Sequence, residues 1–391
     1  MSDHGSESVA TRVREAREAR TPLRIAGAGQ WLHAGAPCTA EHTLVLRDDA
    51  GVVAYEPGDL VLTVRAGTSL AEIDRVTRAE GQWLALDPHG TEDGTIGATV
   101  ATASAGPLAS ALGTPRDHVL GCTVVTGAGD IVHAGGRVVK NVAGFDLVRL
   151  VTGAWGTLGV ITEVTVRLRA VPQREQTLVA PIGTDGELDA ACRWLRTSEV
   201  APMAAELVSS RLATRLGVGT MQALMLRFGG NAALVDAGMR SAATLGRCTE
   251  ADMTVWSALC GREPARAFIA RASCLPSEVA PLWRAIAVEA ERAGGFAHAT
   301  LGRGIVRCVV PLDSDATDNA SGVAWGEAPA WIGGMMQGTI DARARATWIV
   351  ERGAGRVRPT SLHDAARRAL NARTRAAFDP DGILNPGILN T

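Results

Sequence analysis

The stretch 87-DPHGTEDGTIGATVATASAGP-107 contains four glycines, four alanines and one serine, with Ile96 and Val100 set among threonines. These β-branched residues favour a strand over a loose linker. Small residues allow another chain or a ligand to approach the main chain closely. The stretch therefore predicts either a path for an extended cofactor beside the backbone or a tightly packed core of small residues.

Composition sets the broad class of the protein. The chain has 391 residues, of which 46% are hydrophobic and 20% charged, as in a globular protein of two or three domains. A net charge of −2 gives no reason to expect a nucleic-acid partner, and no apolar run reaches the roughly 18 residues of a membrane span. Because residues 1–20 contain no apolar signal core, we expect a cytoplasmic protein.

The cysteines and the lysine also carry information. Seven cysteines, at positions 38, 122, 192, 248, 260, 274 and 308, include no CxxC pair. Their spacing argues against disulfides, structural zinc and iron–sulfur ligation, so no metal site is predicted and an electron-accepting cluster would lie on another chain. Lys140 is the one lysine among 39 basic residues. It is a candidate for a tight site that needs a compact ammonium group, or a by-product of arginine-rich composition.

Hydrophobic periodicity divides the chain into a β-rich first part and a mixed second part. The predicted helices cover 7–20, 69–81, 188–197, 232–245, 279–293 and 362–377, and the predicted strands include 23–26, 60–65, 222–228, 305–311 and 347–350. Residues 118–136 predict two strands around a Gly-Ala-Gly-Asp turn, and 159–171 predict a strand that alternates apolar and polar residues. Residues 173–355 therefore predict a separate α+β domain.

Two glycine-bearing loops, at 26–30 and 88–97, are suited to bind an anion, because successive backbone N–H groups form a nest. A nicotinamide-binding Rossmann domain is disfavoured, since Gly35 and Pro37 follow the first loop where a helix should open. A phosphate P-loop is excluded, because Lys140 is followed by Asn141. This pattern leaves two interpretations open: the two loops bind a diphosphate, or their small residues simply pack closely.

Several segments together resemble the FAD-binding domain of vanillyl-alcohol oxidase-type (PCMH-type) flavoproteins. In chain order they are RIAGAGQ (24–30), GTEDGTIGATVATASAGP (90–107), VVTGAGDIVHAGG (124–136) and VKNVAGFDLVRLVTGAWGTLGVITEVTVRL (139–168). FDPDGILNPG (378–387) looks like the C-terminal end of glycolate oxidase and D-lactate dehydrogenase relatives. The overall organisation resembles the smaller FAD-binding subunits of bacterial glycolate oxidases.

This resemblance implies an α+β fold of three parts. A PCMH-type FAD-binding domain of two α/β subdomains would cover 1–172, and an α+β cap domain with an antiparallel sheet would cover 173–360. A C-terminal helix and tail, 361–391, would return to the FAD domain. By position, non-covalent FAD would be held by Gly27, Ala28, Gly29, Gln30, Pro88, Thr95, Ile96, Gly97, Ala101, Ser104, Gly106, Lys140, Gly159, Val160 and Ile161.

The candidate catalytic residues lie in FAHATLGRGIVRC (296–308). His298 would be the base, and Arg303 and Arg307 would bind the carboxylate of a 2-hydroxy acid. The alternative is that all three are ordinary surface residues. The histidine-rich segment with Asp and Asn that catalytic relatives carry in the cap is absent here.

The function implied by the resemblance is that of an FAD-binding subunit in a glycolate (2-hydroxy acid) oxidase or dehydrogenase complex. It would oxidise glycolate to glyoxylate and pass electrons to an iron–sulfur partner. The expected partners are a larger catalytic flavin subunit and an iron–sulfur subunit, through which the chain would reach the inner face of the membrane. Two alternatives are a stand-alone flavin dehydrogenase of a small hydroxy acid such as lactate and a non-catalytic flavin-binding assembly subunit.

Overall fold

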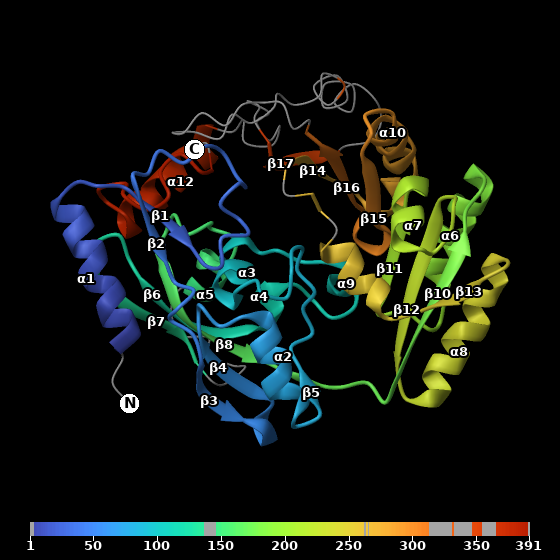
Figure 1. Cartoon of the computed structure of the whole chain (residues 1–391), viewed down its shortest axis with the longest axis horizontal. Coiled ribbons are helices and arrows are strands. Elements are labelled where there is room, and N and C mark those ends of the chain that lie inside the picture. The colour runs from blue at the N-terminus through green and yellow to red at the C-terminus, as the bar shows by residue number, and fades with distance from the viewer. Residues whose placement is uncertain are drawn as a thin grey trace. The chain divides into compact units, whose positions relative to one another are not determined.

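The computed structural model describes residues 4–136, 146–261, 263–264, 266–312, 331, 346–353 and 365–389. The chain forms two compact units, the first from 1–106, 113–171 and 363–391 and the second from 107–112 and 172–362. Figure 1 labels most helices and strands of each unit. The short segment 107–112, which the sequence assigns to the FAD domain, is thus part of the second unit.

The first unit contains two main sheets. Strand β1 (Leu23–Ala26) pairs in parallel with β2 (His42–Val45). A five-stranded sheet, antiparallel at every pairing, has the order β3-β4-β8-β6-β7. Its strands are β3 (Val52–Glu56), β4 (Val61–Arg65), β6 (Val119–Val125), β7 (Ile131–Gly135) and β8 (Val160–Arg167). The short strand β5 (Gln82–Trp83) pairs antiparallel with β9 (Arg169–Ala170), which follows β8 in the chain.

Alternation along β8 places this sheet against its core, as the sequence predicts. Val164, Val166 and Leu168 are at most 1% exposed, while the residues between them are half-buried. The helices of the first unit are α1 (His4–Glu18), α2 (Leu70–Arg78), α3 (Ile96–Thr102), α4 (Pro115–His118), α5 (Leu147–Val151) and α12 (Ala365–Phe378). Ser69 caps α2 by accepting from the Glu72 N–H at 3.1 Å.

The small-residue stretch is helical where a strand was predicted. Thr95 caps α3, and its side chain accepts from the Ala98 N–H at 3.4 Å. Ile96 and Val100 are fully buried on one face, four residues apart, which is the spacing of a helix and not of a strand. The prediction of a strand gave too much weight to β-branching and too little to this spacing.

The C-terminal segment lies against the first strand of the chain. Leu384 forms a parallel bridge with Leu23, and the Leu23 N–H donates to the Ile383 carbonyl at 2.7 Å. Asp379 is 2% exposed and accepts from the N–H groups of Ile383 and Leu384, which shapes the turn that the Asp-Pro pair predicts. Residues 383 and 384 therefore belong to the core beneath α1.

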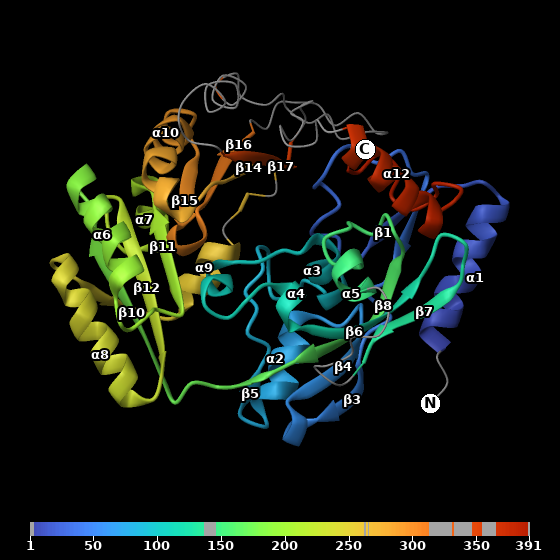
Figure 2. The same ribbon diagram turned by 180° about the vertical axis from the view of Figure 1, so that it is seen from behind.

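The second unit is built on an eight-stranded antiparallel sheet of order β13-β10-β12-β11-β15-β16-β14-β17. The strands are β10 (Arg174–Pro181), β11 (Ala204–Val208), β12 (Ala223–Gly230), β13 (Thr249–Ala251), β14 (Ala267–Ser273), β15 (Phe296–Thr300), β16 (Ile305–Pro311) and β17 (Thr347–Arg352). Helices α6 (Asp185–Thr197), α8 (Ala232–Ala242) and α10 (Val279–Arg292) lie along this sheet in both views (Figures 1 and 2).

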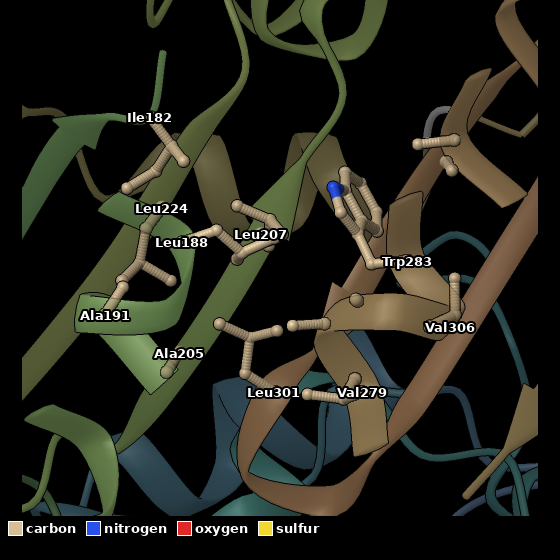
Figure 3. Packing of buried hydrophobic residues seen from close by; sticks show 14 of the residues in the cluster. Ile182, Leu188, Ala191, Ala205, Leu207, Leu224, Val279, Trp283, Leu301 and Val306 are labelled. Carbon is tan, nitrogen blue, oxygen red and sulfur yellow. The ribbon is translucent and has the colours of Figure 1, made fainter. Parts of the chain in front are cut away.

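One continuous apolar core joins these helices to the sheet. Figure 3 shows Leu188 and Ala191 of α6 and Trp283 of α10 among Leu207 and Leu224 of the strands. The Trp283 Nε1–H donates to the Gln222 side chain at 2.7 Å, so this buried indole keeps a polar partner. The fold is α+β, as the sequence predicts.

Candidate functional site

The two glycine-bearing loops meet in the first unit. A Cβ atom at Gly27 would overlap the hydroxyl of Thr95, so this glycine is what allows the loops to touch. The Gln30 side chain bridges them a second time, because its Nε2 donates to the Thr91 hydroxyl and its Oε1 accepts from the Thr91 N–H at 3.3 Å. The loop after β1 and the loop before α3 therefore form one structure.

A pocket opens beside these loops and lies wholly within the first unit. Its walls contain nine residues that the sequence assigns to the cofactor, namely Gly27, Ala28, Gly29, Gln30, Thr95, Gly97, Ala101, Gly159 and Ile161. Ala98, Ala101 and Thr102 present one half-buried face of α3 to the pocket, opposite to the buried Ile96 and Val100. The side chains missing from this helix face leave the space that the pocket occupies.

Five other predicted residues have packing roles and do not line the pocket. Ile96 and Val160 are fully buried in the two cores of the first unit. Ser104 accepts from the His89 N–H at 3.1 Å, and a Cβ at Gly106 would overlap the Asp87 carbonyl, so these residues close the turn after α3. Pro88 is half-buried and stands before α3, between the Asp87 and His89 that these contacts involve. Lys140 lies outside the described residues.

Backbone donors are unevenly divided between the two loops. The Ile96 N–H donates to the Thr68 carbonyl at 3.0 Å and the Gly97 N–H to the Ala66 carbonyl at 2.9 Å, so these groups are already satisfied. In the described part of the chain, no backbone carbonyl accepts from the N–H groups of residues 27–30. Polar groups of a half-buried backbone need partners, so the first loop is the one equipped to bind an anion.

Three further side chains shape the pocket, although the sequence analysis gave them no role. Trp31 and Trp155 meet edge to face, with ring centroids 5.8 Å apart and an interplanar angle of 89°. Asn385 accepts from the Ile25 N–H at 2.8 Å and donates to the Trp155 carbonyl at 2.7 Å. Each of the three lies next to or within a motif on which the family resemblance rests. The sequence therefore marked their neighbourhood but could not predict their contacts.

The expected catalytic cluster is buried and internally paired. His298 on β15 is 4% exposed and is hydrogen-bonded through Nδ1 to Glu206 at 2.5 Å. Arg307, opposite His298 on β16, is 3% exposed, and its Nε donates to Glu263 at 2.8 Å while Nη1 pairs with Glu351. Burial alone would lower the pKa of Arg307, but the two carboxylates outweigh it and raise that pKa.

These contacts bear on both interpretations of the cluster. The charge of Arg307 is already matched by Glu263 and Glu351. His298 and Arg307 are buried, so the surface-residue alternative is wrong for these two, and their catalytic role stays a prediction. Arg303 ends a short 3₁₀ turn (Leu301–Arg303) and is half-buried.

Across the residues that the structure describes, no group of three His, Cys, Asp or Glu side chains could hold a metal ion. In the same residues, no helix is long and apolar enough to cross a membrane.

Comparison with known proteins identifies the domain that contains the two loops. Residues 4–135 match the FAD-binding domain family. Over 190 residues the chain is 38% identical to glycolate oxidase subunit GlcE of Escherichia coli, covering 48% of this chain and 54% of that protein. Over 208 residues it is 32% identical to D-lactate dehydrogenase of Archaeoglobus fulgidus, covering 53% of this chain and 46% of that one.

The fold has a solved counterpart over nearly the whole chain. A crystal structure of alkyldihydroxyacetonephosphate synthase superposes with a TM-score of 0.69 at 16% identity, covering 98% of this chain and 76% of that one. The two sequence relatives, in contrast, are matched over only about half of their own length. The chain therefore contains an FAD-binding domain and is related to glycolate oxidase subunits and D-lactate dehydrogenases.

Proposed function

We propose that this chain is the FAD-binding subunit of a complex that oxidises glycolate or a related 2-hydroxy acid, with glyoxylate as the product from glycolate. The observation that carries the proposal is the pocket of the first unit, where two glycine-bearing loops and the C-terminal segment converge. Similarity to a glycolate oxidase subunit supports the substrate class.

The residues of the pocket fit FAD. The pocket is lined by the glycines and alanines of both loops and by one face of α3. A Cβ at Gly29 would meet only Leu32, at 3.5 Å, so this loop leaves its backbone open to a ligand. The N–H groups of residues 27–30 would hold the diphosphate, and Ala98 and Ala101 leave room along α3 for the rest of the cofactor. Bound FAD would supply a two-electron acceptor for the hydride of the hydroxy acid.

The chain's own residues bind and orient the cofactor in this proposal. Asn385 holds the end of β1 and the Trp155 turn together, so that the first loop and the aromatic pair face one pocket. The cysteine spacing supports a partner that carries the iron–sulfur centre, since no CxxC pair is present. Electrons would leave this chain for that partner.

A second candidate is an assembly subunit that binds FAD without turnover of its own. The pairing of Arg307 with Glu263 and Glu351 favours it over a stand-alone dehydrogenase, because the expected substrate-binding arginine is neutralised. The mutual hydrogen bond of His298 and Glu206 points the same way.

Anaerobic reduction of the purified protein separates these functions. The chain alone should be yellow and should keep its flavin oxidised with glycolate or lactate, whereas the reconstituted complex should bleach it. Bleaching of the isolated chain by lactate would support the stand-alone dehydrogenase. A flavin that stays oxidised in an active complex would support the assembly role. A chain that retains no FAD would overturn the proposal.

A further inference from the structure

Arg24 is the one charged residue among those described that line the pocket. It lies on β1, two residues before the strand ends at Ala26, and only 8% of it is exposed. A buried charge is costly unless it is paired. The position of this arginine therefore calls for an explanation.

The guanidinium holds the first loop from inside. Its Nη2 donates to the carbonyls of Trp31, Leu32 and Ala34 at 3.1, 3.2 and 3.4 Å. Its Nη1 is buried and has no hydrogen-bond partner in the described part of the chain. No carboxylate there forms an ion pair with Arg24, in contrast to the buried Arg307 and Arg227, which both have one.

Carbonyl partners satisfy donors but do not neutralise the charge. An arginine buried beneath a loop whose own N–H groups are also unused creates a positive region at the wall of the pocket. The ligand that such a region suits is an anion, and guanidinium groups match phosphate oxygens well. The diphosphate of FAD is an anion of this kind.

We propose that Arg24 is the counter-charge for the diphosphate of FAD in this pocket. The inference rests on the proposal that the pocket holds FAD and is independent of which hydroxy acid is oxidised. Arg24 would act both by shaping the loop 27–34 through its three carbonyls and by lowering the electrostatic cost of bringing a dianion there. A purely structural Arg24 would do only the first.

Titration of the flavin-free full chain with FAD, ADP and riboflavin separates the two roles. Arg24→Met should weaken FAD and ADP binding about 10- to 100-fold, the size of a charge-assisted contact. Riboflavin, which has no phosphate, should change less than about threefold. Arg24→Lys keeps the charge and should retain ADP binding better than Arg24→Met. Arg14→Met is the matched control, because Arg14 also donates to a carbonyl, that of Gly129, away from the pocket.

An equal loss for FAD and riboflavin, an unchanged FAD affinity, or an Arg24→Lys variant as weak as Arg24→Met would overturn the inference. Should Arg24→Met fail to fold, the test uses the wild-type chain without flavin and inorganic pyrophosphate as the ligand. Millimolar pyrophosphate should raise the melting temperature of this chain, and no rise would refute the role of Arg24 as a counter-charge. Ala98→Trp tests the pocket itself. FAD retained by that variant would contradict the pocket proposal and not the electrostatics of Arg24.

Discussion

Asn385 donates to the carbonyl of Trp155 at 2.7 Å across 230 positions of the chain and also accepts from the Ile25 N–H at 2.8 Å. One side chain thus joins the C-terminal segment, the turn before β8 and the end of β1. Asn385 itself has a φ of +45°, a conformation that asparagine tolerates better than most residues.

We expect Asn385→Ala to destabilise the first unit by about 1–3 kcal/mol, because two half-buried backbone groups lose their partner. FAD affinity should fall at least tenfold, since the first loop and the Trp155 turn are no longer held together. Thermal unfolding and FAD titration measure the two effects. Asn231→Ala is a control of similar kind, because Asn231 caps α8 in the second unit. It should cost about 1 kcal/mol and leave FAD binding unchanged.

Trp155 has a φ of +54°, which is uncommon for a bulky side chain. Its N–H donates to Ala101 at 2.8 Å and its carbonyl accepts from Asn385, so both backbone groups are held. Trp155→Gly removes strain of about 1 kcal/mol, which should offset part of the lost packing. We expect the melting temperature to change little while FAD affinity drops about tenfold. Trp155→Phe keeps an aromatic ring, so this variant should bind FAD more tightly than Trp155→Gly. Equal FAD affinities of the two variants would show that the ring has no part in the site.

Gly97 and Ala98 are neighbours with different roles. A Cβ at Gly97 would lie 2.6 Å from the Ala66 Cβ and 2.9 Å from the Ala66 carbonyl, so Gly97→Ala should destabilise the packing of α3 by about 1–3 kcal/mol. Ala98 faces the pocket, so Ala98→Trp should abolish FAD retention with a near-native melting temperature. Denaturant unfolding together with the flavin absorbance of the purified variants tests both. A flavin-free but equally stable Gly97→Ala protein would reverse the assignment.

Burial raises the pKa of Cys122 and of Cys308 to about 12 each. The thiolate is the reactive form, so at pH 8 only about one thiol in 10⁴ is ionised. Both cysteines should resist iodoacetamide in the folded protein, with labelling that increases as the pH rises toward 12 and becomes complete after unfolding. Mass spectrometry of the peptides measures this. Fast labelling of Cys122 at pH 8 in the native state would contradict its place in the sheet.

Arg307 should matter for stability and not for the flavin. Replacing it by Met leaves Glu263 without this buried ion pair and Glu351 with Arg271 as its remaining partner, which we expect to cost about 3–5 kcal/mol in the second unit. FAD binding by the first unit should remain as in the wild type. The double variant with Glu351→Gln should recover part of the lost stability, and a double-variant stability no better than the single one would argue against a charge pair.

The sequence was most informative where its pattern is local. The apolar alternation of 159–171, the Ser69 cap and the Gly-Ala-Gly-Asp turn each depend on residues close together, and β8, α2 and the β6–β7 hairpin follow them. The misjudged stretch is 96–102, where β-branched residues form a helix because Ile96 and Val100 share one buried face. Intrinsic preference was overridden there by tertiary packing.

The site was predictable in outline and not in its contacts. Glycines indicated both loops, because the positions where the backbone carries no side chain can be read directly from the sequence. Other features depend on which chain segments meet in the folded protein. These are the place of Ile96 and Val160 in the core and of Arg24, Trp155 and Asn385 in the pocket wall. For His298 and Arg307 the paired carboxylates come from positions 44 to 92 residues distant, which no local motif reveals.

The pocket wall runs from Arg24 near one end of the sequence to Ile388 near the other. During synthesis the loop at 27–30 leaves the ribosome long before residue 388 is made, since chains grow at about 5–20 residues per second. A nascent chain therefore exposes an unfinished binding surface for tens of seconds. On the proposal that this pocket holds FAD, the nucleotide would be bound only after the chain is complete.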